Sequence, residues 1–391
     1  MINAIASLRI QDKLSPVKNP DFAWCWLFLP ALIGYFVLLG AHLNAKPEIG
    51  SVKIYNDAYK SLVKSPIEVI ATGLVWAEGP LWIEDSTKSS SYLLFSDVVA
   101  NRIWRYDEGK GFFSVGKSVK VPLSGCKLNK TDCERHFEVG SNGLVKLFAA
   151  PDAGADIVAC QHGERAVTIL YENGTRLFLA THYKEERLHS PNDLVFSNEG
   201  HLYFTDPTYG RFHFSKEFMI DVELEHAGVY MIHRDEIRKS IATGLPTSNL
   251  KLLIDDMNLP NGIIFSPGYV KAYVSNSDPE NAYWRVYDVM DDGTFANGRV
   301  FYNATSLIAK GHAGNPDGMA MDAKGMLFAS GPGGVLAFTP EGELVARLVV
   351  PNKSVSNLAF GPNGLLFMTA TDSILRVKLN TRGAKVSGAW R

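Results

Sequence analysis

A short pattern occurs six times along this chain, and it constrains the fold more than any other feature of the sequence. In each copy an acidic or amide side chain stands just before an apolar run, which a turn and a second alternating run follow. The copies are separated by roughly 40–70 residues, a spacing seen in proteins built from repeated structural units. We call these six side chains the ring residues: Glu78, Asn142, Asn192, Asn261, Asp317 and Asn357.

A recurring unit of this length, made of short strands, predicts an all-β fold, a six-bladed β-propeller. Equivalent positions of all blades face one axis in that fold, so we expect the ring residues to converge on a single channel. The strand-and-turn pattern is continuous from Ser65 to Lys378, and no linker or long amphipathic helix interrupts it. To close the ring, residues near Ile67–Thr72 should pair beside the strand at Ile374–Leu379, which removes exposed sheet edges.

The N-terminal region predicts a transmembrane helix in front of the propeller. Residues 22–41 carry no charge and are long enough to cross a bilayer, whereas the apolar region of a signal peptide is usually shorter. Basic residues before this segment favour a cytoplasmic N-terminus. We therefore expect a single-pass membrane protein with a lumenal or extracellular catalytic domain, or a secreted one if the segment is cleaved. The expected parts are a cytoplasmic tail (1–21), a signal-anchor (22–41), a stem (42–65) and the propeller (66–391).

Charge and cysteine content restrict the partners. The formal net charge is −2 and no basic stripe occurs, which argues against nucleic acid. Cys126 and Cys133 bracket a polar insert and either close a small disulfide loop or remain free thiols. Four Asn-x-Ser/Thr sequons are compatible with glycosylation in a secretory compartment, at Asn129, Asn173, Asn303 and Asn352.

The chemistry of the ring residues indicates a hard cation. Carboxylate and amide oxygens without His or Cys suit calcium, which takes about 6–8 oxygen ligands, and zinc or magnesium are the alternatives. Two carboxylates would neutralise one divalent ion, whereas left unpaired in one channel they would be costly. An Asn before Gly is by itself a common turn residue, but six at one phase favour a site. The predicted metal ligands are Glu78, Asn192, Asn261 and Asp317, and Asn142 and Asn357 are expected to support them by hydrogen bonds.

A cation with an open coordination position polarises an ester oxygen. Asp317 is then the predicted catalytic residue, acting as general base for water or as nucleophile. The predicted substrate-binding residues are Asn192, His162, Arg165 and Tyr209, with Asp193 and Asp206 as further lining candidates. Structural hydrogen bonding is an equal alternative for His162. No serine-nucleophile elbow, phosphate-binding loop or dinucleotide fingerprint follows a strand.

Six motifs in order carry a family resemblance: WAEGPLW, VACQHGERAV, SPNDLVFSNEGHLYFTDPTYG, LPNGIIFSP, GNPDGMAMDAKGMLFASGPGGVLAF and LAFGPNGLLF. The chain resembles the SMP-30/gluconolactonase/LRE-like family of six-bladed propellers from about Val69 to Leu379. The resemblance implies a hydrolase that opens aldonolactones or related cyclic esters with one divalent ion, usually calcium or zinc. It places the metal ligands at Glu78, Asn261 and Asp317, puts Asn192 on metal or substrate, and makes Asp317 the acid/base. The N-terminal apolar segment and the Cys126–Cys133 insert depart from soluble members.

The function expected on these grounds is a metal-dependent hydrolase that opens a lactone by polarising its carbonyl, with acid/base catalysis by Asp317. Strictosidine-synthase-like and arylesterase or phosphotriesterase propellers are the alternatives among related folds. A calcium-stabilised binding scaffold without turnover is the alternative from another class. In a scaffold the ion would be fully coordinated by protein, and in an enzyme one coordination position would stay open.

Overall fold

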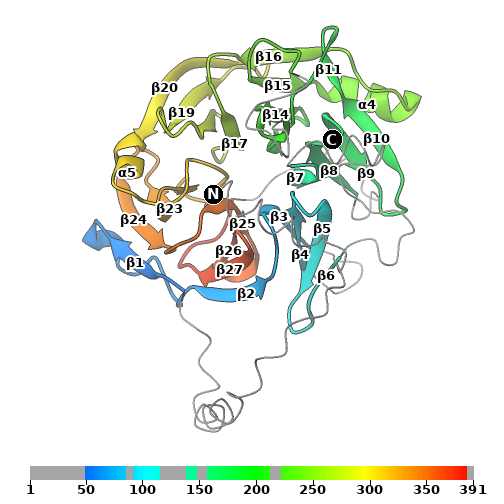
Figure 1. Ribbon diagram of the computed structural model, residues 1–391. Helices are drawn as coiled ribbons and strands as arrows, with labels where there is room; N and C mark the ends of the chain where they lie inside the picture. Colours follow the sequence, from blue (N-terminus) through cyan, green and yellow to red (C-terminus); the bar gives the residue numbers. More distant parts are fainter. Residues whose placement is uncertain (1–48, 85–90, 115–137, 148–155, 212–221, 385–391) are drawn as a thin grey trace, which may run out of the picture. The chain divides into compact units, whose positions relative to one another are not determined.

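The computed structural model describes residues 49–84, 91–114, 138–147, 156–211 and 222–384, which belong to one compact unit, Glu48–Arg391. Six antiparallel sheets form its blades, and Figure 1 shows them arranged around a common centre. In every blade the strand that comes first in the repeat is innermost, and the inner strands of neighbouring blades contact each other around the whole ring. The predicted six-bladed propeller is confirmed.

The strands follow the chain from blade to blade. Blade 1 contains β3 (Ala77–Ile83), β4 (Tyr92–Asp97), β5 (Arg102–Asp107) and β6 (Gly111–Ser114). Blade 2 contains β7 (Ser141–Lys146), β8 (Ile157–Gln161), β9 (Ala166–Leu170) and β10 (Arg176–Ala180). Blade 3 contains β13 (Leu194–Phe196), β14 (Leu202–Asp206), β15 (Gly228–Ile232) and β16 (Leu250–Ile254). Blade 4 contains β17 (Pro260–Phe265), β18 (Lys271–Asn276), β19 (Tyr283–Val289) and β20 (Phe295–Asn303).

The last two blades each take their outermost strand from the N-terminal part of the chain. Blade 5 contains β21 (Met319–Met321), β22 (Leu327–Gly331), β23 (Gly334–Phe338), β24 (Leu344–Val349) and then β1 (Ser51–Ile54). Blade 6 contains β25 (Val355–Phe360), β26 (Leu365–Ala370), β27 (Ser373–Lys378) and then β2 (Glu68–Thr72). The pairing of β2 with β27 confirms the predicted closure. The strand β1 lies within the segment 42–65 that was expected to be a stem.

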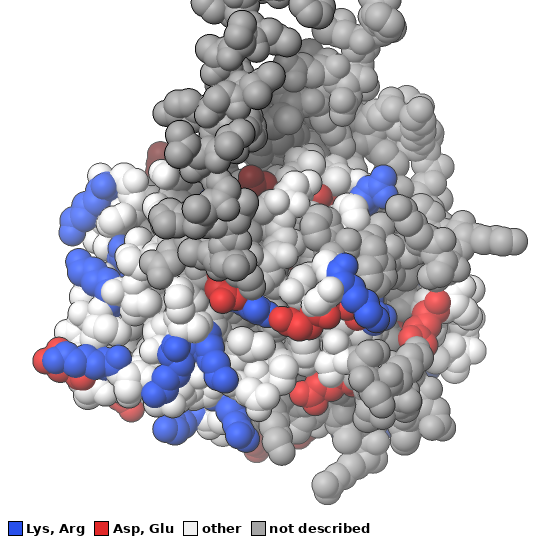
Figure 2. All heavy atoms as spheres, turned by 90° about the horizontal axis from the view of Figure 1, so that it is seen from below, with Lys and Arg blue, Asp and Glu red and all other residues white. Residues whose placement is uncertain are grey.

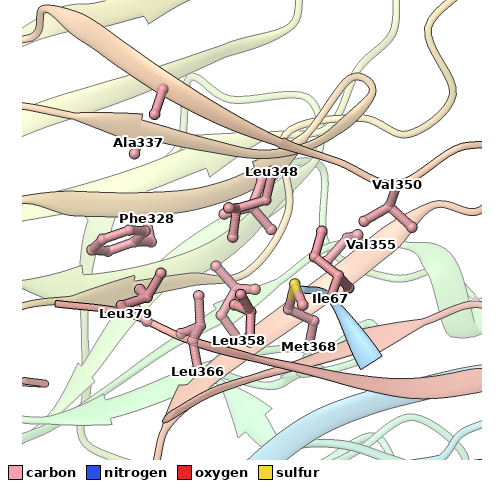
Figure 3. Close-up of a cluster of buried hydrophobic side chains, with 14 of the residues drawn as sticks. Ile67, Phe328, Ala337, Leu348, Val350, Val355, Leu358, Leu366, Met368 and Leu379 are labelled. Atoms are coloured by element: carbon pink, nitrogen blue, oxygen red, sulfur yellow. The ribbon is translucent and has the colours of Figure 1, made fainter. Parts of the chain in front are cut away.

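Apolar side chains fill the space between neighbouring blades. Figure 3 shows this for blades 5 and 6, where residues from both sheets pack on Ile67, the residue before β2. Apolar and polar residues alternate along the strands, yet both faces of each sheet are buried, because each blade lies between two others. The side chains labelled there are Ile67, Phe328, Ala337, Leu348, Val350, Val355, Leu358, Leu366, Met368 and Leu379.

Hydrogen bonds connect the inner part of each blade to the next, and they form a closed circuit. The Ser96 hydroxyl donates to the Asn142 carbonyl (2.7 Å), and the Gly143 amide donates to the Asn192 carbonyl (2.8 Å). The Thr205 hydroxyl donates to the Asn261 carbonyl (2.7 Å). The remaining links run from the Ser277 hydroxyl to the Pro316 carbonyl, from the Gly318 amide to the Ser356 carbonyl (2.7 Å), and from the Ser356 hydroxyl to the Ala77 carbonyl (2.6 Å).

The helices of the described residues are short. They are α4 (Arg234–Thr243), α5 (Thr305–Ala309) and the 3-10 turns η1 (Asp57–Tyr59), η2 (Tyr209–Arg211) and η3 (Pro362–Gly364). The longest, α4, has 10 residues and spans about 15 Å, half of a bilayer core. By length and by composition, these helices fall short of what a membrane span requires.

The predicted transmembrane helix therefore requires a correction. The described part of the chain contains no such helix, and the fold class of the described residues is an all-β propeller. The single-pass membrane localisation derived from that helix has no support either. The apolar segment 22–41 itself lies outside the described residues.

Several smaller predictions concern the surface. The Cys126–Cys133 insert and the sequon at Asn129 lie outside the described residues. The sequons at Asn173, Asn303 and Asn352 are exposed, and their glycosylation stays a prediction. Figure 2 shows basic and acidic side chains interspersed on one side of the molecule.

Gly262 lies where two neighbouring blades approach each other closely at their inner ends. A Cβ at this position would lie 2.4 Å from the Asp317 carbonyl oxygen of the next blade. We expect Gly262→Ala to lower the free energy of unfolding by about 3 kcal/mol, because backbone must move to relieve the overlap. Urea denaturation measures this.

The control is Gly268→Ala, in the β17–β18 turn. Gly268 has φ +83° and open space where the methyl group of an alanine would lie, so only backbone strain of about 1 kcal/mol is expected. Equal stability of Gly262→Ala and the wild type would contradict this account of inter-blade packing.

Candidate functional site

The ring residues lie at the inner end of each blade, as predicted. Glu78, Asn142, Asn261 and Asn357 are the second or third residues of the innermost strands β3, β7, β17 and β25, and Asn192 and Asp317 stand two residues before β13 and β21. The five ring residues other than Asp317 are buried, with Glu78 only 2% exposed. We call this region the hub.

The hub brings three carboxyl groups close enough to repel one another. Burial raises the pKa of Glu78 to about 8, and the negative charge of Asp193 contributes. Burial likewise raises the pKa of Asp193 to about 6. The pKa of Asp317 lies well above its usual range because of burial first and then the charges of Glu78 and Asp193. A positive charge at the hub would relieve all three.

Asp317 presents an oxygen that the described protein leaves unsatisfied. Its Oδ1 atom is buried and has no hydrogen-bond partner among the described residues. The side chain as a whole remains partly exposed, so solvent reaches it. Its main chain is fixed by a hydrogen bond from the Asp317 amide to the Ser330 carbonyl (3.1 Å) and by the adjacent link from Gly318 to Ser356. A fixed carboxylate oxygen without a partner suits a cation, a water or a substrate group.

The ring amides Asn261 and Asn357 differ in which side-chain atom the protein holds, the nitrogen in Asn261 and the oxygen in Asn357. The Asn261 Nδ2 donates to the Ser277 hydroxyl (3.0 Å), which itself donates to the Pro316 carbonyl, so the Asn261 Oδ1 is turned away from Ser277. Asn357 does the reverse: its Oδ1 accepts from the Leu358 amide (2.7 Å). The Asn357 side chain hydrogen-bonds to the carboxyl groups of Glu78 and Asp193, which moderates their pKa. Asn261 can thus offer an oxygen to a cation, and Asn357 stabilises the carboxylates as a donor.

Tyr209 stands beside this cluster, on the turn η2. Burial raises the pKa of its phenol, and the charge of Asp317 raises it further. Its side chain hydrogen-bonds to Ser277 and Asn261. The phenol therefore stays protonated next to the candidate base and can donate a hydrogen bond there.

His162 is fully buried at the end of β8, on the blade 2 side of the hub. Its Nδ1 lies 3.0 Å from Glu138 Oε2, although the two are poorly aligned for a regular hydrogen bond. Its Nε2 lies 3.5 Å from the Nδ2 atom of Asn142. The charge of Glu138 also raises the pKa of Glu78 and of Asp317, which places this carboxylate near the hub.

Arg165 is occupied by the protein itself. Its guanidinium donates to the carbonyls of Leu188 (2.6 Å) and Arg187 (3.2 Å) and to Glu223 (2.8 Å). These contacts attach the two-stranded hairpin of β11 (His182–Tyr183) and β12 (Glu186–Arg187) to blade 2. The substrate-binding role predicted for Arg165 stays a prediction, but its guanidinium nitrogens already have protein partners.

Asp206 closes the turn that carries Asn192. Its carboxylate accepts hydrogen bonds from the amides of His189 and Ser190, both at 2.8 Å. Burial raises the pKa of Asp206 to about 7, and these two amides limit the rise. Through this turn Asp206 fixes where the chain enters blade 3. The predicted role of Asn192 as metal or substrate ligand stays a prediction.

The contacts of three residues at the hub, Asp193, Glu138 and Ser277, were not predicted from the sequence. Asp193 occupies the position after the ring residue, where Gly79, Gly143, Gly262 and Gly318 stand in other blades. Its carboxylate accepts from the Ile263 amide (3.2 Å) of blade 4, and it adds a charge to the hub. That departure from glycine was the available signal. Glu138 and Ser277 had none, because neither belongs to the repeated pattern.

Carboxylate and amide oxygens together, rather than carboxylates alone, form a donor set that fits a divalent cation. Among the described residues, no group of three or more His, Cys, Asp or Glu side chains is arranged to hold a metal ion by itself. Glu78 and Asp317 with amide oxygens, Asn261 foremost, form a set of hard oxygen donors. The Asp317 oxygen without a partner among the described residues and the raised pKa values of the carboxyl groups agree with a site built for positive charge.

The fold and the site define the class of this protein: it is a closed six-bladed β-propeller with buried carboxyl and amide groups at its hub. Residues 76–372 match the SMP-30/Gluconolactonase/LRE-like region, and the chain belongs to that family.

The known relatives support this assignment. The chain is similar to gluconolactonase from Zymomonas mobilis subsp. mobilis, with 34% identity over 332 residues that cover 82% of this chain and 83% of that protein. It is 28% identical to 6-deoxy-6-sulfogluconolactonase from Pseudomonas putida over 81% of this chain and 88% of that protein. A solved structure of a gluconolactonase from Xanthomonas campestris has a TM-score of 0.66 and 26% identity, and the match covers 86% of this chain and 98% of that one.

The raised carboxyl pKa values predict how stability depends on pH when divalent cations are removed. From about pH 5 to 8 the folded protein keeps a proton on Glu78 that the unfolded chain has lost. The free energy of unfolding should therefore fall with rising pH, by up to about 1.4 kcal/mol per pH unit for each such proton. Urea denaturation in EDTA between pH 5 and 8 measures the slope.

Glu78→Gln is the matched control, because it keeps the size of the side chain and removes the titration. We expect a shallower slope for this variant than for the wild type. A wild-type stability that rises with pH over this range would show that the hub carboxyl groups are paired in the metal-free protein.

Proposed function

We propose that this protein is a metal-dependent lactonase that hydrolyses a sugar lactone of the gluconolactone type. The observation that carries the proposal is the buried Oδ1 of Asp317, which has no hydrogen-bond partner among the described residues. It lies beside Glu78 and Tyr209, at the hub of a member of this family. Two curated relatives over four-fifths of the chain are a gluconolactonase and a sulfogluconolactonase, which supports the substrate class.

The proposed cation is calcium, with zinc and magnesium as the alternatives, held by oxygens of Glu78, Asn261, Asp317 and Asn192. When bound, it supplies positive charge that keeps the carboxylates ionised and polarises the lactone carbonyl. Glu78 and Asp317 together carry the two negative charges that balance a divalent ion. Asn357 donates to Glu78 and Asp193 and leaves their remaining lone pairs for other partners.

The proposed reaction uses Asp317 as the acid/base. Ionised Asp317 takes a proton from water as the water oxygen forms a bond to the lactone carbonyl carbon. The bond between that carbon and the ring oxygen then breaks, and the ring oxygen receives the proton from Asp317. The product is the open hydroxy acid. Tyr209, held protonated beside Asp317, donates a hydrogen bond to an oxygen that gains negative charge during this sequence.

Replacing the acid/base tests the proposal directly. We expect Asp317→Asn to lower kcat/KM for its best lactone by about 10³-fold, in the range of general acid–base catalysis. A pH-stat assay with a panel of aldonolactones measures acid release. The wild type should lose activity in EDTA and regain it when calcium, zinc or magnesium is added back.

Asp292→Asn provides the control, since Asp292 is exposed in the β19–β20 turn. It should keep wild-type activity. Turnover that chelators do not affect would contradict the metal-dependent mechanism, and a fully inactive panel would favour a binding scaffold.

Tyr209→Phe tests the second hub residue. Removing one hydrogen-bond donor from a developing oxyanion lowers the rate by about 10²-fold or more in well-studied enzymes. We expect a fall of that size in kcat with little change in the affinity for the metal ion. Steady-state kinetics and a calcium titration on the same preparation separate the two effects. An unchanged kcat would exclude Tyr209 from the reaction.

A further inference from the structure

Asn142, the ring residue of blade 2, has an oxygen that nothing in the described structure explains. The side chain is 3% exposed, and its Oδ1 is buried without a hydrogen-bond partner among the described residues. Its backbone is held firmly, because the Asn142 carbonyl accepts from the Ser96 hydroxyl at 2.7 Å. That carbonyl also abuts Gly79, the residue after Glu78. The backbone of Asn142 therefore packs against the chain segment that carries the hub carboxyl group Glu78.

The other end of the amide faces His162. The Asn142 Nδ2 and the His162 Nε2 are 3.5 Å apart. Glu138 lies against the opposite ring nitrogen, with Oε2 3.0 Å from Nδ1. A carboxylate at Nδ1 favours the imidazole proton on that nitrogen and leaves the Nε2 lone pair to accept from the amide. Because a carboxamide is planar, holding its nitrogen on His162 turns its oxygen away from that ring.

The same arrangement occurs at Asn261, two blades further on. There Ser277 is fixed as an acceptor by its own donation to the Pro316 carbonyl, and it holds the Asn261 Nδ2 at 3.0 Å. Asn357 is the contrasting case, because its Oδ1 is already occupied by the Leu358 amide. Asn142 and Asn261 thus both have the amide nitrogen on a side-chain partner, and the Asn142 oxygen has no partner among the described residues.

We propose that Asn142 is an additional oxygen ligand of the hub cation, and that Glu138 and His162 are positioning residues that orient it. The proposal rests on the metal-dependent function proposed above and adds blade 2 to its ligand set. In this arrangement the fully buried His162 acts through Asn142. The Asn142 oxygen lacks a partner among the described residues because its partner is the ion.

Calcium binding to the chelated full-length protein tests the proposal without relying on turnover. We expect Asn142→Leu, which keeps the shape and removes the oxygen, to weaken calcium binding by at least tenfold in isothermal titration, on the order of the loss that follows disruption of a metal site. Asn142→Asp retains an oxygen and should bind calcium at least as tightly as the wild type. Cys160→Ala is the control, because Cys160 is buried in β8 near His162 but has no part in the site.

A double-mutant cycle tests the positioning role. His162→Phe should weaken calcium binding by about tenfold in the wild-type background and have no further effect in Asn142→Leu. An equal loss in both backgrounds would mean that His162 is only structural and would overturn its role. Urea denaturation of each variant confirms folding, and Asn142→Asp decides the ligand question if Asn142→Leu does not fold.

The outcomes separate this inference from the function on which it rests. Wild-type protein that hydrolyses a lactone and binds calcium, with unchanged binding in Asn142→Leu, would overturn the inference alone. Wild-type protein that binds none of calcium, zinc and magnesium would overturn the metal-dependent function and this ligand with it. Weaker binding in Asn142→Leu that Asn142→Asp restores would support both.

Discussion

Hydrogen bonds that pass from the inner part of each blade to the next hold in place the backbone that carries the hub side chains. The circuit begins with the bond from Ser96 to Asn142 and closes with the bond from Ser356 to Ala77. It fixes one backbone segment in each of six blades, and these segments are far apart in the sequence. Carboxyl groups that would separate in a flexible chain are held together against their mutual repulsion. Burial is the main cause of the raised pKa of Glu78, and the charges of the neighbouring carboxyl groups add to it. Close packing of the circuit also explains why small residues follow most ring residues.

The parts of the fold that repeat were the parts that the sequence could predict. Ring residues recur at one phase of each repeat, and a propeller places one phase at one radius, so their convergence followed from periodicity alone. The pairing of β2 with β27 followed from the need to close the sheet ring. Neither inference required knowledge of any individual contact. The strand β1 was missed because its short, exposed sequence resembles a linker.

The parts that depend on single contacts were not predictable. Asp193 replaces the usual glycine, yet only the structure shows its carboxylate accepting from Ile263 of the next blade. The substrate-binding role of Arg165 stays a prediction, and only the structure shows that its guanidinium holds a hairpin to blade 2. A charged residue next to a conspicuous motif can serve either purpose, and sequence does not distinguish them. The apolar segment 22–41 had the composition of a membrane helix, which composition alone does not establish.

The outer strands of blades 5 and 6 pair segments from opposite ends of the chain, and this has a consequence during synthesis. The strand β2 leaves the ribosome before the first blade, but its partner β27 appears only after the strands of the other five blades. Until then β2 has no sheet to join, and the apolar faces of blades 5 and 6 stay open. Non-local pairing of this kind delays folding and leaves the nascent chain exposed to aggregation. The protein can therefore acquire its native hub only after β27 has been synthesised.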